Sequence, residues 1–268
     1  MKKSVKVIDI PIHTITKDKL EEIITKKLNK KDKPLFITTV NSSFILKSIE
    51  NKDFARYLKY KSDINVADGT GVQLAAEYLE KKQKFTRLIP FVILWVRMGI
   101  SYIVGKSQFS VIKQRITGVE ITDFLLKYAD KKGFKVLIIH KKTGLLSKKE
   151  IEENFNKQLK GINCKVINIE ENQESVKEEY SVDIVLSDLG EVRQELFMYK
   201  NKDKIKAKIY IGIGSSLDIL FNKIKPAPNF FKKRGLEWLF RIITRPKRAR
   251  KAFISTIIFP YKVYKTCV

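Results

Sequence analysis

The chain has 268 residues, of which 44% are apolar and 31% charged, so it can bury the core of one sizeable domain or of two small ones. Its 54 Lys and Arg against 29 Asp and Glu give a formal net charge of +25, which indicates nucleic acid, anionic lipid or phosphorylated substrates as partners. The two cysteines, Cys164 and Cys267, are far apart, which argues against a disulfide framework and suits a reducing cytoplasm. Residues 1–10 alternate like a first strand and lack the apolar run of a signal peptide.

Short apolar runs typical of strands alternate with helical periodicity along most of the chain. The alternation predicts an α/β fold with Rossmann-like, mostly parallel sheets covered by helices. Ligands of such folds bind outside the carboxyl ends of the strands. The predicted strands are Leu35–Thr39, Ile64–Ala67, Val136–Ile139, Cys164–Ile169, Ile184–Leu186 and Ile209–Ile213.

Three loops at predicted strand ends carry polar residues suited to chemistry. Thr39 and Asn41 follow the first of these strands, where they can bind sugar hydroxyls or simply cap the next helix. Asp68 stands in Ala67-Asp68-Gly69-Thr70-Gly71, where a carboxylate can act as a general base, although an Asp-Gly turn is also common. Residues 187–195 form a strand-to-helix junction, whose helix N-terminus suits an anionic ligand; its acids alternatively just complement the helix dipole.

The segment from Phe85 to Gly105 is too apolar for a surface loop. A buried core helix, an interfacial or re-entrant membrane segment and a membrane span are the three interpretations. Arg97 near the middle leaves an uninterrupted apolar length short of the ~20 residues that a span needs.

The carboxyl-terminal part is strongly basic and rich in aromatic residues. Between Lys225 and Lys265 there are twelve Lys or Arg and a single acid, Glu237. This composition is typical of a membrane-surface binder, with a solvated tail and a nucleic-acid binder as alternatives. We therefore predict a catalytic α/β domain over residues 1–223, with an apolar insertion at about 81–114. A basic helical appendage over residues 224–268 would associate with the membrane and complete the active site.

Several motifs of other chemistries are absent from the sequence. It contains no Asp-x-Asp pair, no Walker-type loop and no complete Gly-x-Gly-x-x-Gly. Two histidines, His13 and His140, cannot form a metal cluster by themselves. We therefore expect neither a metal nor a cofactor, and expect positive side chains to bind any diphosphate.

An ordered set of motifs resembles the WecG/TagA/CpsF glycosyltransferase family. The most specific part is carboxyl-terminal, and the resemblance runs from about Thr38 to about Lys251. The motifs are Thr39-x-Asn41, Asp68-Gly69-x-Gly71, Arg115-x-Thr117-Gly118, Gln194-Glu195, Gly212-x-Gly214 with Asp218, Pro226-Ala227-Pro228, Gly235-Leu236-Glu237-Trp238-Leu239-Phe240-Arg241 and Pro246-Lys247-Arg248.

The resemblance implies a metal-independent, inverting transferase. Its donor would be a UDP-sugar that carries N-acetylmannosamine or a related hexose, and the transfer would take place at the inner face of the cell membrane. The acceptor would be an amino sugar linked to polyprenyl diphosphate, and the product would feed teichoic acid, common antigen or capsule synthesis. Asp68 matches the base, and Thr39, Asn41 and Gln194 match substrate-binding positions. By motif, Arg241, Arg248 and Lys251 would bind the diphosphate, Lys251 standing where another arginine is usual.

Three departures from the family pattern leave alternatives open. Val192 replaces a usual proline, and His140-Lys141-Lys142-Thr143 replaces a loop of glycine and small residues. The insertion at 81–114 forms either a second membrane contact or an oligomer contact. The alternative functions are an inactive or repurposed member that binds nucleotide-sugar or membrane without turnover, and a basic nucleic-acid-binding module, although we expect no nucleic-acid partner. The sequence is also compatible with a homo-oligomer.

Overall fold

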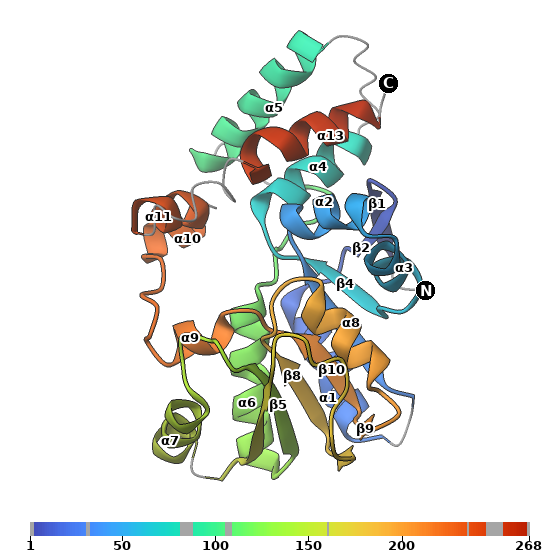
Figure 1. The fold of residues 1–268 in the computed structure, drawn as a ribbon. Coiled ribbons are helices and arrows are strands. Elements are labelled where there is room, and N and C mark those ends of the chain that lie inside the picture. The colour runs from blue at the N-terminus through green and yellow to red at the C-terminus, as the bar shows by residue number, and fades with distance from the viewer. Residues whose placement is uncertain are drawn as a thin grey trace.

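The computed structural model describes residues 3–30, 33–80, 88–104, 109–159, 161–234, 236–244 and 254–266. At its centre lies a six-stranded sheet in which every pairing is parallel and the strand order is β4-β3-β10-β8-β5-β6 (Figure 1). This confirms the predicted α/β class with a mostly parallel sheet. The strands are β3 (Leu35–Val40), β4 (Ile64–Ala67), β5 (Lys135–Lys141), β6 (Asn163–Ile169), β8 (Ile184–Ser187) and β10 (Ile209–Gly212).

All six predicted strands are present; β4 has the predicted bounds, and the bounds of the other five differ from the prediction by one or two residues. The four inner strands are buried almost throughout; every residue of β3, β8 and β10 is buried. A strand covered on both faces needs no polar alternation, which is why continuous apolar runs marked these strands in the sequence.

Helices cover both faces of the sheet. One face packs against α1 (Lys17–Leu28), α6 (Gly118–Lys132), α7 (Lys148–Gln158) and the short α9 (Ser216–Leu220). The other face packs against α2 (Ser42–Glu50), α3 (Lys52–Tyr60) and α8 (Arg193–Lys200). The chain therefore leaves neighbouring strands toward opposite faces, and such points are where crevices form outside the carboxyl ends of strands.

The predicted first strand exists, but it lies outside the central sheet. It is β1 (Ser4–Val7), which pairs antiparallel with β2 (Ile10–His13). Ile8 and Asp9 both have positive φ, 47° and 64°, so the connection has the geometry of a two-residue hairpin turn whose twist matches the strands. A second small sheet pairs β7 (Tyr180–Ser181) with β9 (Ile205–Lys206).

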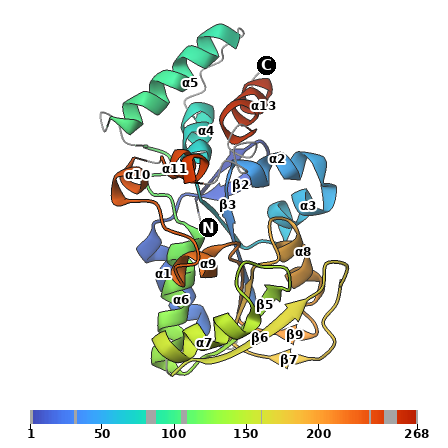
Figure 2. The ribbon, with the colours of Figure 1, turned by 60° about the vertical axis from the view of Figure 1, so that its left-hand side comes forward.

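The remaining helices lie toward one end of the molecule. At this end α4 (Thr70–Glu80), α5 (Leu88–Ile103) and α13 (Phe259–Lys265) lie together, in both views far from α7 (Figures 1 and 2). A π-helical turn, η2 (Ile254–Ile258), leads into α13, and α10 (Asn229–Lys233) and α11 (Glu237–Thr244) precede it.

The carboxyl-terminal helix α13 is part of the main core. Phe259 and Val263 have no exposed surface and belong to the same apolar cluster as Val40 of β3. The boundary predicted between residues 223 and 224 stays a prediction. The packing shows only that α13 is not a free tail.

The apolar segment forms α5, and the helix is buried on one side only. Phe91 is fully buried and Leu94 and Trp95 are partly buried against the core, whereas Val92, Val96 and Ile100 are exposed. The core-helix interpretation is therefore right for one face of α5 and wrong for the other. No helix in the described ranges has the length and hydropathy needed to cross a bilayer.

Candidate functional site

Asp68 lies at the carboxyl end of β4, directly beside the end of β3. Its backbone N–H donates to the carbonyl of Val40 at 2.8 Å, and its side chain is half-buried. The neighbouring Gly69 approaches Asn41 so closely that a Cβ there would lie 3.9 Å from the Asn41 Cβ. The two predicted loops, Thr39-x-Asn41 and Asp68-Gly69-x-Gly71, thus form one site although 27 positions separate Asn41 from Asp68 in the sequence.

A third motif, Arg115-x-Thr117-Gly118, reaches the same edge of the sheet. The Ile116 N–H donates to the carbonyl of Ala67 at 2.9 Å. Thr117 caps α6 through its side chain, and Gly118 begins that helix. A Cβ on Gly118 would lie 3.5 Å from Thr39 Oγ1 and 3.4 Å from Ser216 Oγ. The α6 N-terminus therefore lies beside two hydroxyls, from β3 and α9. The Ser216 hydroxyl already donates to the Ile213 carbonyl at 2.6 Å, so toward a ligand it acts as an acceptor, whereas the N–H groups of the helix start suit an anionic or sugar ligand.

Glycine is required at Gly71 for close packing of two helices. A Cβ at this position would lie 2.5 Å from Ser42 Oγ at the start of α2. Asn41 caps that same helix: its Oδ1 accepts hydrogen bonds from Ser43 N at 2.9 Å and Phe44 N at 3.2 Å. The capping interpretation of Asn41 is thus confirmed for its oxygen, and a substrate contact by this residue stays a prediction.

The side chains of Gln194 and Glu195 pack against the turn after β10, and Gln194 is hydrogen-bonded to it. The two side chains are 2% and 1% exposed. Gln194 Nε2 donates to Glu195 Oε1 at 2.6 Å, while Gln194 Oε1 accepts from Gly214 N at 3.2 Å. A Cβ on Gly212 would overlap both side chains. The Gln194-Glu195 and Gly212-x-Gly214 motifs are therefore two halves of one packed unit, in which Gln194 is placed behind the edge of the sheet rather than in open solvent.

Burial raises the pKa of the Glu195 carboxyl to about 8, against the opposing effect of its hydrogen bonds with Gln194 and the Val192 N–H. The Val192 backbone has φ 75° and ψ −55°, in the region that favours glycine and is unfavourable for a β-branched residue. A proline, fixed near φ −65°, cannot adopt it. The loop therefore takes a course that the proline usual in the family would not allow.

The acids of the 187–195 junction are held by specific partners. Glu191 accepts a hydrogen bond from Ser43 Oγ at 2.9 Å and pairs with Lys47 at 3.1 Å, which joins this loop to α2. Two hydroxyls at the strand-end edge, Thr70 Oγ1 and Ser187 Oγ, are buried with no hydrogen-bond partner among the described residues. Polar groups in such a position are available to a ligand.

His140 and Asp188 form a buried pair between the ends of β5 and β8. His140 is 2% exposed; its Nδ1 lies 2.6 Å from Asp188 Oδ2 and its Nε2 lies 2.8 Å from the Leu146 carbonyl. Asp188 also accepts from Lys141 N at 2.8 Å. Both ring nitrogens therefore face acceptors, and both are satisfied together only in the doubly protonated imidazolium.

Burial opposes this protonation, but the hydrogen bond and charge of Asp188, followed by the Leu146 carbonyl and the charge of Asp218, raise the pKa of His140 above its ordinary value. A Cβ on Gly144 would lie 2.8 Å from His140 Cε1, so the loop after β5 folds closely over the ring. This is the loop whose composition departs from the family pattern. The departure is visible in the sequence but the ion pair is not, because nothing in the spacing connects His140 with Asp188.

The predicted tail residues are placed less fully. Arg241 lies on α11, but its side chain lies outside the described part of the structure. Arg248 and Lys251 lie outside it entirely. Ser216 and Gly118 are additions to the predicted site. A small hydroxyl residue at a helix start, as at Ser216, gives no signal in the sequence beyond that of a cap.

Hollows on the described surface lie away from this edge. One of about 750 Å³ runs along α5 and one of about 330 Å³ lies between α1 and α6. Neither is lined by Asp68, Thr39 or Gln194. We place the candidate site at the sheet edge because backbone donors and a carboxylate meet there, whereas the hollow along α5 is lined by five apolar residues with Arg97 and Ser101. Within the described ranges, no group of three or more His, Cys, Asp or Glu side chains is arranged to hold a metal ion.

An α/β fold with a carboxylate and several helix N-termini at the carboxyl edge of a parallel sheet is typical of enzymes that bind nucleotides or sugars. Residues 5–98 and 94–268 match the Glycosyl transferase WecG/TagA/CpsF family, so the chain belongs to this family and is a glycosyltransferase by membership. The two matched segments overlap within α5, where the insertion was predicted.

A relative in Bacillus spizizenii (strain ATCC 23059 / NRRL B-14472 / W23) is named N-acetylglucosaminyldiphosphoundecaprenol N-acetyl-beta-D-mannosaminyltransferase. It is 24% identical to this chain over 225 residues, which cover 82% of this chain and 75% of the relative. The family membership inferred from the ordered motifs is thereby confirmed.

Proposed function

We propose that the chain transfers a sugar, N-acetylmannosamine or a related hexose, from a UDP-sugar to an amino sugar linked to polyprenyl diphosphate, in the synthesis of a cell-surface polymer. The name of the Bacillus relative supports the acceptor and the transferred sugar. The observation that carries the proposal is the placement of Asp68: a half-buried carboxylate at a strand end, next to Thr39, the α6 N-terminus and Ser216.

Asp68 acts as the general base in a single in-line displacement. The acceptor hydroxyl attacks the anomeric carbon on the face opposite the leaving UDP, and Asp68 takes the hydroxyl proton as the new bond forms. One displacement inverts the anomeric configuration, so one carboxylate is enough. The N–H groups at the start of α6, with the Thr39 and Ser216 hydroxyls, hold the donor at this edge.

Negative charge grows on the leaving diphosphate, and fixed cations stabilise that transition state more than the ground state. Arg241, Arg248 and Lys251 are the proposed partners of the diphosphate, on the family motif alone. An arginine fork can bind two phosphate oxygens together, whereas Lys251 offers a single point charge. No metal is required in this scheme.

The protein works at the inner face of the cytoplasmic membrane as a peripheral protein. The acceptor is anchored in the bilayer by its lipid, and the carboxyl-terminal part, with twelve Lys or Arg against one acid between Lys225 and Lys265, is attracted to an anionic leaflet.

The first prediction is a loss of transfer on removal of the base. Transfer from a panel of UDP-sugars to a short-chain polyprenyl-diphosphate N-acetylglucosamine is measured with chelator present. Asp68→Asn should lower kcat by roughly a hundredfold to ten-thousandfold, whereas the matched Asp53→Asn change, at a 78% exposed carboxylate on α3, should leave it unchanged. Equal activity of wild type and Asp68→Asn would exclude Asp68 as the base, and activity that needs a divalent metal would exclude the metal-free scheme.

One observation favours the alternative of a family member that binds without turnover. The His140–Asp188 pair lies at the carboxyl ends of β5 and β8, and the loop after β5 packs closely against the His140 ring. Failure of every donor to react, combined with failure to bind UDP in calorimetry, would favour a repurposed member that no longer takes a nucleotide-sugar over an unsuitable acceptor.

A further inference from the structure

We propose that α5 is a membrane-docking helix: its outward face lies in the plane of an anionic lipid surface and inserts its apolar side chains among the lipids. The inference rests on the membrane-bound acceptor of the proposed function, and assigns the contact to the inserted helix in addition to the basic tail.

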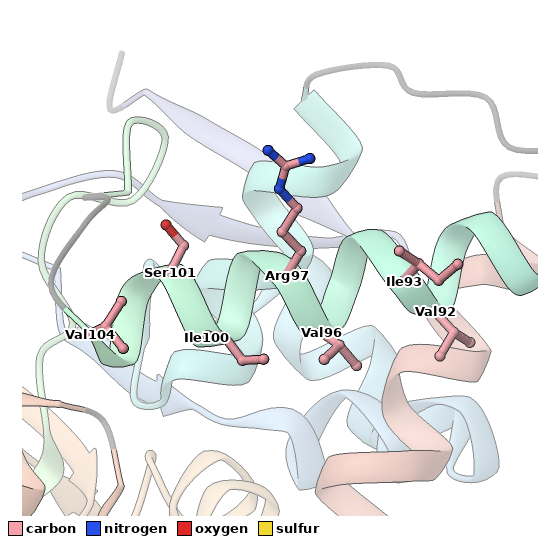
Figure 3. A pocket seen from close by; sticks show the side chains of 7 residues that line it. All are labelled: Val92, Ile93, Val96, Arg97, Ile100, Ser101 and Val104. Atoms are coloured by element: carbon pink, nitrogen blue, oxygen red, sulfur yellow. The ribbon is translucent and has the colours of Figure 1, made fainter.

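The outward face of α5 is apolar and exposed. Val92, Ile93, Val96, Ile100 and Val104 are between 47% and 63% exposed. They recur at spacings of three and four residues, which places them along one side of the helix. Figure 3 shows Val92, Val96 and Ile100 on one side, with Arg97 and Ser101 on the opposite side.

This exposure is not spread evenly over the molecule. Of the thirteen large apolar side chains that are exposed in the described residues, ten belong to the stretch 92–104 or to the part of the chain after residue 229. An apolar surface concentrated in one region marks an interaction site rather than the scattered exposure normal for a monomer.

The inward face of α5 fixes the helix to the core. Phe91 packs edge-on against Tyr78 of α4 at 4.9 Å between ring centroids and tilted against Tyr264 of α13 at 5.2 Å. Trp95 packs against Phe259 at 6.5 Å. At the other end, Arg234 Nη1 donates to the Ile103 carbonyl at 2.7 Å. With both ends and one face attached, α5 presents its apolar side as a fixed surface.

Charge selects an anionic lipid surface as the occupant. The insertion from Lys81 to Gln114 contains seven Lys or Arg and no acid, and the chain after Glu237 contains eight Lys or Arg and no acid. A second copy of this chain carries the same +25 charge and would be repelled electrostatically. An apolar face that is flanked in the sequence by basic segments is complementary to acyl chains beneath anionic headgroups.

The length of α5 requires an in-plane orientation. Sixteen residues span about 24 Å at 1.5 Å per residue, less than the ~30 Å of a hydrocarbon core. With one face packed on α4 and α13, the helix lies along the surface. Arg97 is exposed and projects away from Val96 and Ile100, so its guanidinium can stay among the headgroups and water when those side chains insert.

The test uses the full chain and extruded vesicles of phosphatidylcholine with 30% phosphatidylglycerol, without donor or acceptor. Val96→Ser/Ile100→Ser should weaken binding roughly ten- to thirtyfold, because two half-inserted apolar side chains are lost. The matched Ile49→Ser/Tyr60→Ser variant removes two exposed apolar side chains from α2 and α3 and should bind as wild type. Unchanged binding by Val96→Ser/Ile100→Ser would overturn the proposal.

Light scattering tests the competing occupant of the exposed α5 face, which is a second copy of this chain. A wild-type mass of two copies that falls to one in Val96→Ser/Ile100→Ser would show an interface between copies and overturn the lipid assignment. Transfer assays separate this proposal from the proposed function: the variant should keep wild-type kcat on a water-soluble short-chain acceptor and lose rate only on an acceptor in vesicles. Absence of transfer by wild type on both acceptors would reject the enzymatic proposal and leave the vesicle result valid.

Discussion

The carboxyl edge of the central sheet and the α5–α13 end of the molecule are the two regions that we propose as contact sites, and they are built on opposite principles. At the sheet edge, polar side chains are buried and held by one another: Gln194 and Glu195 are at most 2% exposed, and His140 is bonded at both ring nitrogens. On α5, apolar side chains are exposed, and the helix is held through its inward face and the Arg234–Ile103 hydrogen bond.

This difference shows what each region can recognise. A buried polar network has its atoms in fixed positions, which suits a small ligand whose hydroxyls and charges must be matched one by one. An apolar helix face has no directional groups and gains free energy from area alone, which suits an extended apolar phase. Substitutions that remove atoms from one region should therefore have effects of a different kind from substitutions in the other.

The largest effect on the free energy of unfolding is expected on α5, where a residue of the buried face is compared with a residue of the exposed face. Phe91→Ala should lower the free energy of unfolding by about 3–5 kcal/mol, because a fully buried ring among Tyr78, Trp95 and Tyr264 leaves a cavity. Val92→Ser, one residue further and 48% exposed, should change it by less than about 0.5 kcal/mol. Urea unfolding followed by circular dichroism measures both; similar values for the two variants would contradict the anchoring of α5.

A smaller effect is expected at the polar edge. Gly212→Ala should cost about 2–3 kcal/mol, because the added methyl group overlaps the Gln194 amide and the Glu195 carboxylate in a packed site. Its matched control is Gly99→Ala on α5, where a Cβ meets nothing within 4 Å. That variant should gain up to about 1 kcal/mol from helix propensity. The same chemical change thus has opposite signs in the two regions, and a loss at both positions would mean that Gly99 is also packed.

Much of the sheet edge could be predicted from the sequence. The inner strands of the central sheet were marked by short, mainly apolar runs, because burial on both faces removes polar alternation, whereas exposed and buried residues are mixed along the edge strand β6. Asp68 and Thr39 could be placed together because the ends of neighbouring parallel strands meet. Gln194 was predicted to line the pocket, but its hydrogen bond to Gly214 and its burial depend on a three-dimensional fit that spacing does not encode.

The parts that could not be predicted depend on contacts between distant segments. The His140–Asp188 pair joins residues 48 positions apart through the pairing of β5 with β8. The amino-terminal residues alternate like a strand, yet alternation says nothing of the partner, and β1 pairs with β2 instead of joining the central sheet. For α5, composition revealed an apolar segment, but only the packing of Phe91 shows which side is covered.

The His140–Asp188 pair gives the smallest predicted effect and tests whether the polar edge carries a buried charge. Because the folded pKa of His140 lies above its unfolded value, the pair's contribution to stability is full below about pH 6.5 and is lost as pH rises through the folded pKa. Asp188→Asn should therefore destabilise the protein by about 1–2 kcal/mol at pH 6. The difference from wild type should narrow as pH rises toward 10, in urea unfolding followed by circular dichroism.

The comparison must be made as a difference between variants, because Glu195, whose pKa burial raises to about 8, also makes the folded state less stable as pH rises from its unfolded value. Glu195 is present in wild type and in Asp188→Asn, so its contribution cancels. Asp123→Asn, which removes an exposed carboxylate paired with Lys127 on α6, should show a small difference that does not vary between pH 6 and 10. A constant difference for Asp188→Asn as well would mean that His140 is neutral. In that case the loop over β5 would be held by packing around Gly144, and the polar edge would owe its rigidity to the Gln194–Glu195 unit rather than to a buried ion pair.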